Sequence, residues 1–369
     1  MALPFIILGV AAAATAFGGK KAYDGYQKKS EADDVLDRAQ RRFDKHKESF
    51  ETVNKTTEKK LDELGKIELK IGNDFGEFNT IAEKLLKLME KSGHKNLRLT
   101  VPKHRINKIQ NLAISATEYL TTVVGAGASG AAAGFAVYSG VMAFAAASTG
   151  TPIAALSGVA AYNATMAAIG GGSLAAGGWG MAGGAMVLGG AVVAPLIAIA
   201  GWAYDSHAEK ALNNAYQSSR EVTAAVEKMN SAEAHLTKVQ QYVNSIYESI
   251  TRMHTVFVEH YFAPLKAMNA IIEERHKKDI TTEIDESKEI MDLIEHGYEL
   301  AAIMTDVITT PLFKPMTQKN NEAVIEAVIK DGVIQLQTDS NGMNLLNQEA
   351  LDKQLAAATS GFNAFTSRI

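Results

Sequence analysis

The sequence predicts an all-α protein, built as a long antiparallel helical hairpin or coiled-coil bundle around a central, glycine- and alanine-rich apolar helical region. Three observations in the chain of 369 residues support this prediction. Two long stretches repeat apolar residues at gaps of three and four, which is the spacing of a helix face. No proline interrupts either stretch, and an uncharged region lies between them.

The first stretch covers residues 20–89, which as one helix would form a rod roughly 100 Å long. Such a helix cannot bury its apolar stripe alone, so it needs a helical partner. The stripe consists of His46, Phe50, Val53, Thr57, Leu61, Leu64, Ile67, Ile71, Phe75, Phe78, Ala82, Leu85 and Met89.

The second stretch supplies that partner, because its apolar residues keep a heptad spacing over five repeats. Two such arms joined by one apolar segment most simply fold back as an antiparallel hairpin or bundle. The stripe of this arm consists of Val222, Ala225, Met229, Ala232, Leu236, Val239, Val243, Ile246, Ile250, Met253, Phe257 and His260.

Three glycines, Gly65, Gly72 and Gly76, lie inside the first arm, where each costs about 1 kcal/mol relative to alanine. They indicate either a close helix contact or bend, or tolerated surface positions. The pattern alone leaves both interpretations open.

After Pro264 the elements become shorter. We expect a helix over residues 283–310, ending before Pro311, and another over residues 321–330, stopped by the Asp331-Gly332 pair. A short strand over residues 333–337, a turn over residues 339–342 and a last helix over residues 349–365 follow. The predicted regions are therefore an apolar N-terminal segment (1–19), a first arm (20–118), an uncharged block (119–204), a second arm (205–278) and a C-terminal region (279–369).

The uncharged block contains no Asp, Glu, Lys, Arg or His and holds 18 of the 30 glycines. Small residues recur at four-residue spacing, which in a membrane brings helix backbones into contact. Its end carries the aromatic pair expected at a membrane boundary. We predict that these residues insert into a bilayer and pack helices: Ala126, Gly130, Gly134, Ala176, Gly180, Gly184, Trp202 and Tyr204.

Gly125, Gly127 and Gly130 also match a dinucleotide-binding fingerprint. That fingerprint needs an acidic residue about 20 positions later, but the next acidic residue is Asp205. We therefore expect no cofactor.

A run of positive charges directly precedes the block, with no acidic residue between Glu90 and Glu118. Positive charges beside apolar segments stay on the cytoplasmic side and attract anionic headgroups. The alternative is a solvated helix surface. We define the basic run, our candidate headgroup site, as Lys91, Lys95, Arg98, Lys103, Arg105 and Lys108.

The segment 1–19 is apolar and is followed by Lys20 and Lys21, which fits a short anchor better than a cleaved secretory signal. It also fits an apolar strip packed on the block. Nucleic acid is not expected as a partner, because the chain carries a net charge of −4 and the basic run lacks aromatic residues.

Catalytic patterns are missing: no H-E-x-x-H, no Walker lysine, no G-x-S-x-G and no cysteine occurs. His254, Glu259 and His260 lie within two helical turns, but His260 belongs to the apolar stripe, so we favour packing histidines over a metal site. We predict no catalytic or metal residues and no enzyme.

Long amphipathic helices around a glycine- and alanine-rich apolar block resemble the general plan of bacterial α-helical pore-forming toxins over residues 20–265. The glycine-rich stretch beginning TPIAALSGVAAYNATMAAIGGG is similar to segments of uncharacterised bacterial membrane-associated proteins. The resemblance implies a membrane-active protein, although the block is longer than the usual inserting hairpin.

We therefore expect a protein that inserts its block into a bilayer, oligomerises and permeabilises or perturbs the membrane. The placement of charges fits the inner membrane of its own bacterial cell, with the arms cytoplasmic. One alternative is a membrane-anchored coiled-coil scaffold that recruits a helical partner protein. Another is a soluble helical protein with a buried glycine-rich core.

Overall fold

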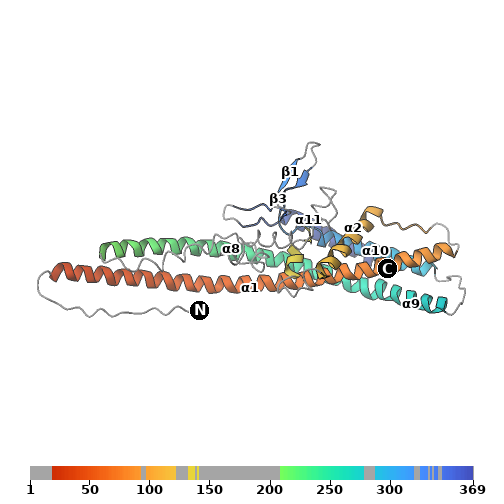
Figure 1. The fold of residues 1–369 in the computed structure, drawn as a ribbon, viewed down its shortest axis with the longest axis horizontal. Helices are drawn as coiled ribbons and strands as arrows, with labels where there is room; N and C mark the ends of the chain where they lie inside the picture. Colours follow the sequence, from red (N-terminus) through yellow and green to blue (C-terminus); the bar gives the residue numbers. More distant parts are fainter. Residues whose placement is uncertain are drawn as a thin grey trace. The chain divides into compact units, whose positions relative to one another are not determined.

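The computed structural model describes residues 19–92, 97–121, 132–137, 139–140, 208–277, 287–319, 325–330, 333–334, 336–339 and 343–368. The protein is all-α, as predicted (Figure 1). Its helical elements are α1 (Gly19–Lys91), α2 (Lys103–Tyr119), α8 (Ala208–Phe257), the π-helical turn η3 (Val258–Phe262), α9 (Ala263–Lys277), α10 (Ser287–Ile308) and α11 (Gln348–Thr366).

Two compact units share both long helices. Unit 1 comprises Met1–Glu48 and Val193–Glu227, and unit 2 comprises Ser49–Val192 and Lys228–Ile369. Each long helix therefore contributes its first part to unit 1 and the remainder to unit 2.

In unit 1, α1 pairs with α8 through a small apolar cluster of Ala32, Val35 and Ala215. Polar contacts also join the two helices in this unit: Arg42 donates hydrogen bonds to the Ser219 carbonyl (3.1 Å) and to Thr223 Oγ1 (2.7 Å). Phe43 of α1 and Val222 of α8 are also buried in this unit.

In unit 2, the predicted apolar stripes of the two arms form the main core, since most of their residues are buried. Phe75 and Phe78 of α1 pack edge-on against Phe257 of α8, with ring centroids 5.3 and 5.2 Å apart. The interface between α1 and α8 is called the seam below. A helical partner for the first arm was expected from its spacing, and the seam provides it.

The predicted antiparallel direction of the arms is wrong. Residue numbers rise together along the seam: Gln240 donates to Thr57, Lys60 to Asn244, and His254 to Asp74. Helices α1 and α8 are therefore parallel within unit 2.

The antiparallel partner of α1 is α2. Gln110 of α2 donates to Asn79 of α1, and the later residue Ala116 lies against the earlier residue Gly72. The chain thus turns back along α1 through α2 before α8 begins, and this return path permits a parallel second arm. Apolar spacing could not reveal it, because a helix stripe looks the same in either chain direction.

The predicted stripe position of His260 is also wrong, because His260 is exposed. The π-helical turn η3 adds one residue to the helical turn, so Tyr261 and Phe262 are buried instead. Its cause is local: Pro264 has no N–H to bond a carbonyl of the preceding turn, and the Ala263 N–H bonds the Val258 carbonyl.

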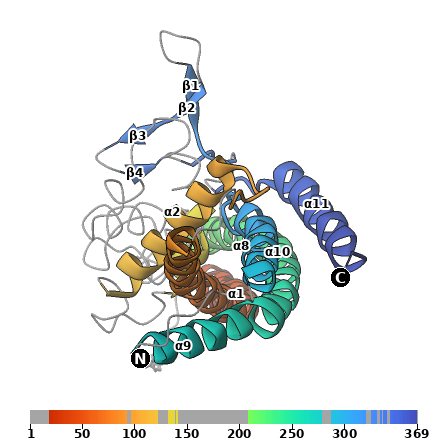
Figure 2. The same ribbon diagram turned by 90° about the vertical axis from the view of Figure 1, so that its right-hand side faces the viewer.

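Helices α10 and α11 complete unit 2. Tyr298 of α10 donates to Asn79 of α1 (2.7 Å) and packs edge-on against Phe78. Figure 2 shows α11 beside α10, where Phe365 contacts His296. The observed bounds agree closely with the helices predicted over residues 283–310 and 349–365.

The helix predicted over residues 321–330 is wrong in its described part. Strand β2 (Ile325–Ala327) pairs antiparallel with β1 (Thr317–Lys319), and β3 (Ile329–Lys330) pairs with β4 (Val333–Ile334). The β-branched residues Ile325, Val328 and Ile329 favour strands. The Asp331-Gly332 pair between β3 and β4 is typical of a two-residue hairpin, so it suits a strand pair better than a helix stop.

Candidate functional site: where the uncharged block meets the helical bundle

A short piece of the uncharged block is described, and it is buried in unit 2. Residues 132–137 and 139–140 are helical, and we call them the docked segment. Ala132, Ala133, Phe135 and Val137 belong to the main hydrophobic core. Phe135 packs edge-on against Tyr119 at the end of α2, with ring centroids 5.1 Å apart.

At Gly65, the backbone of α1 is in direct contact with the backbone at the beginning of the docked segment. A Cβ on Gly65 would lie 1.7 Å from the Ala132 carbonyl oxygen, so no larger residue fits without movement. A Cβ on Gly72 would lie 2.4 Å from the Ala116 Cβ, whereas one on Gly76 would make only an ordinary contact at 3.6 Å. Close helix contact is therefore the correct interpretation for Gly65 and Gly72.

The end of the docked segment is held by the residues that follow α10. A Cβ on Gly140 would lie 2.6 Å from the Thr310 carbonyl, so only glycine fits this approach. The Ser139 hydroxyl donates a hydrogen bond to the Ile308 carbonyl at 3.3 Å. The segment is thus fixed between α1 and the end of α10.

Glu68 of α1 lies at this contact and is 2% exposed. Its Oε2 atom has no hydrogen-bond partner among the described residues. Burial raises the pKa of Glu68 well above its ordinary value, and the nearby Ser139 hydroxyl is a smaller influence that lowers it. A buried carboxyl without a charged partner favours its neutral form.

Sequence reasoning missed Glu68 and Ser139. Gly65, Glu68, Gly72 and Gly76 follow one another at gaps of three, four and four, so Glu68 shares a helix face with the glycines. An acidic residue on the same helix face as closely spaced glycines is the sequence signal that could have identified Glu68. Ser139 is one of several hydroxyls in the block, and nothing in the spacing distinguished it.

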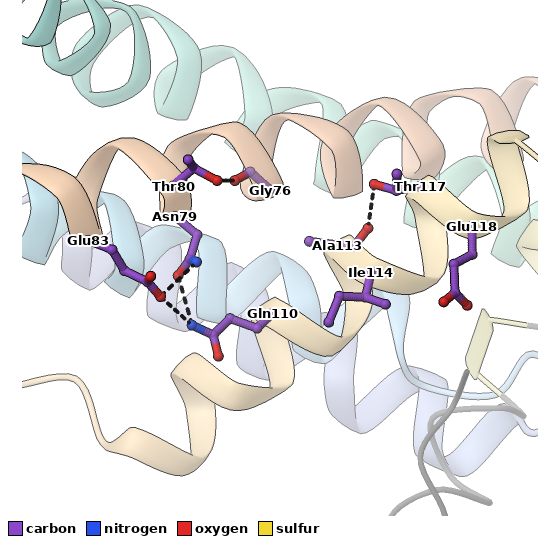
Figure 3. Close-up of a pocket in the computed structure, with 9 residues that line it drawn as sticks. All are labelled: Gly76, Asn79, Thr80, Glu83, Gln110, Ala113, Ile114, Thr117 and Glu118. Atoms are coloured by element: carbon purple, nitrogen blue, oxygen red, sulfur yellow. Dashed lines mark hydrogen bonds between the residues drawn. The ribbon is translucent and has the colours of Figure 1, made fainter. Parts of the chain in front are cut away.

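A groove with a volume of about 490 Å³ lies between α1 and α2 (Figure 3). Gln110 donates to Asn79 (3.0 Å) and Glu83 (3.2 Å), so its polar groups are largely paired with one another. Ile114 on its rim is 51% exposed. Small residues such as Gly76 and Ala113 line one part of the groove, and the polar side chains of Asn79, Glu83 and Gln110 bond one another. We therefore assign no chemical role to this groove.

The basic run is divided by the structure. Arg105 and Lys108 of α2 both pair with Asp306 of α10, at 2.7 and 2.8 Å. Lys91, Arg98, Lys103 and Lys108 are exposed, Arg105 is half-buried, and Lys95 lies outside the described residues. Lys91, Arg98 and Lys103 remain candidates for headgroup contact, while Arg105 and Lys108 join α2 to α10.

Of the residues predicted to insert into a membrane, only Gly134 is described, and it is buried in the docked segment. Ala126, Gly130, Ala176, Gly180, Gly184, Trp202 and Tyr204 lie outside the described residues. Among the helices that the structure describes, none has the length and apolarity to cross a membrane.

His254 lies in the seam, where its Nε2 donates to Asp74 Oδ2 at 2.8 Å. Its ring stacks on Phe257. The described part of the chain contains no group of three or more His, Asp or Glu residues placed to hold a metal ion.

Comparison with known proteins adds no relative. No protein-family model matches this chain, and no curated protein or solved structure does. Any functional proposal therefore rests on the residues described above.

Proposed function

We propose that this protein is membrane-active: it holds its uncharged block against a helical bundle and delivers that block to a bilayer, where it oligomerises and permeabilises or perturbs the membrane. The observation that carries the proposal is the block itself, 86 residues without Asp, Glu, Lys, Arg or His between Tyr119 and Tyr204. Segments of about 20 such residues are long enough to cross a bilayer.

The contact between block and bundle supports this proposal. The docked segment is held by backbone approaches at Gly65 and Gly140 and by the hydrogen bond from Ser139 to the Ile308 carbonyl, with no ion pair at the contact among the described residues. Such a contact can separate without leaving ionised groups of the block to be transferred into lipid, which would be costly.

A second candidate function also has an observation in its favour. Residues 132–137, 139 and 140 are buried in the bundle, which fits a helical protein whose glycine-rich block is a permanent part of the core. The two candidates differ in whether the block ever leaves the bundle, so one experiment separates them.

The test uses the full chain with vesicles containing anionic lipid. We expect the protein to float with the vesicles and to release an enclosed dye. Gly180→Leu places a bulky side chain on a predicted small-residue face, so it should reduce dye release and cross-linked oligomers while flotation persists. Protein that neither floats nor releases dye would favour the permanent core, and flotation without dye release would favour the scaffold.

The exposed part of the basic run provides a matched comparison. Reversing Lys91, Arg98 and Lys103 to Glu should weaken vesicle binding most at low salt, since screening acts over about 8 Å at 0.15 M. Reversing Lys55, Lys70 and Lys87, which are exposed along α1, changes the net charge equally. Equal losses from both triple variants would show that net charge, and not the basic run, controls binding.

A further inference from the structure

A second groove, with a volume of about 710 Å³, lies between α8 and α11 in unit 2. The two helices are joined just before it, where the Tyr242 hydroxyl donates to Asp352 at 2.8 Å. Short side chains line the α11 wall, among them Ala356 and Ser360, which are both exposed. The chain carries no charge between Lys353 and Arg368, so another helix can approach this wall closely without burying an ionised group of α11.

The α8 wall of the groove carries one acidic and one basic side chain, Glu248 and Arg252. Both are exposed, and neither makes an ion pair or a hydrogen bond within the described part of the chain. The same spacing of four residues does give an ion pair on α1, where Lys66 lies 2.6 Å from Asp62. Both charged groups of the groove are therefore available to opposite charges from outside the chain.

The exposed face of α8 at this groove is complementary to itself. Ser245, Glu248, Arg252 and Thr255 follow one another at gaps of three and four, so they lie on one helix face, and all four are exposed. Two copies of this helix can pack antiparallel around a two-fold axis level with Ile250. Glu248 of each copy then faces Arg252 of the other, and Ser245 of each copy faces Thr255 of the other.

The polar groups of that arrangement match in kind as well as in charge. Thr255 donates its hydroxyl hydrogen to the Thr251 carbonyl at 3.0 Å, so its oxygen can accept a hydrogen bond from Ser245 of the other copy. A parallel, in-register packing would instead oppose Glu248 to Glu248 and Arg252 to Arg252. Charge complementarity therefore selects the antiparallel arrangement.

We propose that the groove between α8 and α11 binds a second copy of this chain, in an antiparallel two-fold contact with two reciprocal ion pairs between Glu248 and Arg252. Exposed ion pairs are individually weak, so their main effect is to fix orientation, while packing of the short side chains excludes water. The contact belongs to the helical bundle and not to the uncharged block, so it goes beyond the function proposed above.

The test measures the dimer dissociation constant of the full chain without lipid, by sedimentation velocity over a range of protein concentrations. Glu248→Arg opposes two positive charges in both symmetric pairs, and Arg252→Glu opposes two negative charges in both. Each single variant should raise the dissociation constant by about tenfold or more, because two attractions become two repulsions. Circular dichroism should show unchanged helix content, since both positions are exposed.

A mixture of the two single variants tests the reciprocal contact directly. When Glu248→Arg pairs with Arg252→Glu, every facing pair again consists of opposite charges, so the mixture should dimerise about as tightly as wild type. The double variant with both substitutions in one chain should dimerise as well, since it exchanges the two charges. An ion pair formed within one chain cannot produce rescue by mixing.

Glu90→Arg and Lys70→Glu are the matched controls, because they change the net charge equally at exposed positions of α1 outside the groove. Neither should change the dissociation constant. A wild-type chain that stays monomeric at every concentration would overturn the proposal. So would single variants that dimerise like wild type, or a mixture that shows no rescue. These measurements contain no lipid, so their outcome does not depend on the proposed membrane function.

Discussion

Helix α1 uses two different kinds of interface in unit 2. Toward α8 it buries large side chains, including Phe75 and Phe78, which are 0% exposed. Toward α2 and the docked segment it presents Gly65 and Gly72, where backbones approach so closely that a Cβ would clash. One helix thus has a seam of large side chains and a face of glycines.

The difference indicates how each interface holds. Burial of large apolar side chains contributes roughly 1.5–3 kcal/mol for each residue, so the seam is expected to stay closed while the protein is folded. The glycine face also buries apolar side chains, among them Leu112 and Phe135, but it includes the buried carboxyl of Glu68, whose Oε2 atom has no hydrogen-bond partner among the described residues. We therefore expect the glycine face to open first.

The largest effect should come from the seam. Phe257→Ala removes a ring that contacts Phe75 and Phe78, and we expect the free energy of unfolding to fall by about 3–5 kcal/mol in urea denaturation. Tyr247→Ala is the control, since Tyr247 is 38% exposed on the same helix and should change stability by about 0.5 kcal/mol or less. Similar losses from both variants would contradict a seam-centred core.

The polar pair within the seam should have the next largest effect. Asp74→Ala leaves the buried His254 ring without its acceptor, which we expect to reduce the free energy of unfolding by about 1–3 kcal/mol. The double variant Asp74→Ala with His254→Leu should recover part of that loss, because no buried donor then remains unpaired. If the double variant loses more free energy of unfolding than Asp74→Ala and His254→Leu lose together, the two residues act through contacts other than their shared hydrogen bond.

The glycine face should respond locally. Gly65→Ala forces a Cβ against the Ala132 carbonyl, and we expect a loss of about 1–3 kcal/mol, with reduced amide protection in residues 132–137 and unchanged protection along the seam. Gly76→Ala meets only an ordinary contact and should gain about 0.5–1 kcal/mol from helix propensity. Urea denaturation should therefore show opposite changes in the free energy of unfolding for the two variants, and hydrogen exchange should locate the loss in Gly65→Ala to residues 132–137.

The smallest stability effect should come from the ion pairs between α2 and α10. Asp306→Asn frees Arg105 and Lys108, and because all three side chains are about a third exposed or more, the loss should be about 1 kcal/mol or less. Binding to anionic vesicles should increase. Asp292→Asn, at an exposed position on α10, is the charge-matched control, and an equal increase there would assign the gain to net charge alone.

The sequence located the long helices and the residues that they bury. Gaps of three and four without proline predicted a helix over residues 20–89, and α1 covers Gly19–Lys91. The predicted stripe of the second arm is buried from Val222 through Phe257. It fails at His260, because periodicity assumes a uniform helix and the turn before Pro264 is π-helical.

The candidate site was only partly predictable. The uncharged block and the glycines of α1 were visible in the sequence, but which residues of the block meet which glycines was not. The spacing of Glu68 with the glycines places it on the face where helices come close, but it does not show that the side chain is buried. That burial depends on parts of the chain distant in sequence, such as Ala132 against Gly65.

The sequence by itself determined that this chain forms long helices, where their apolar faces lie and which region carries no charge, because these properties depend on side chains a few positions apart. Only the tertiary structure decided that α1 and α8 run parallel, that α2 returns between them in the chain, and that Glu68 becomes buried against Ser139. The physical reason is that helix direction and burial depend on the path of the connecting chain, to which apolar periodicity is indifferent.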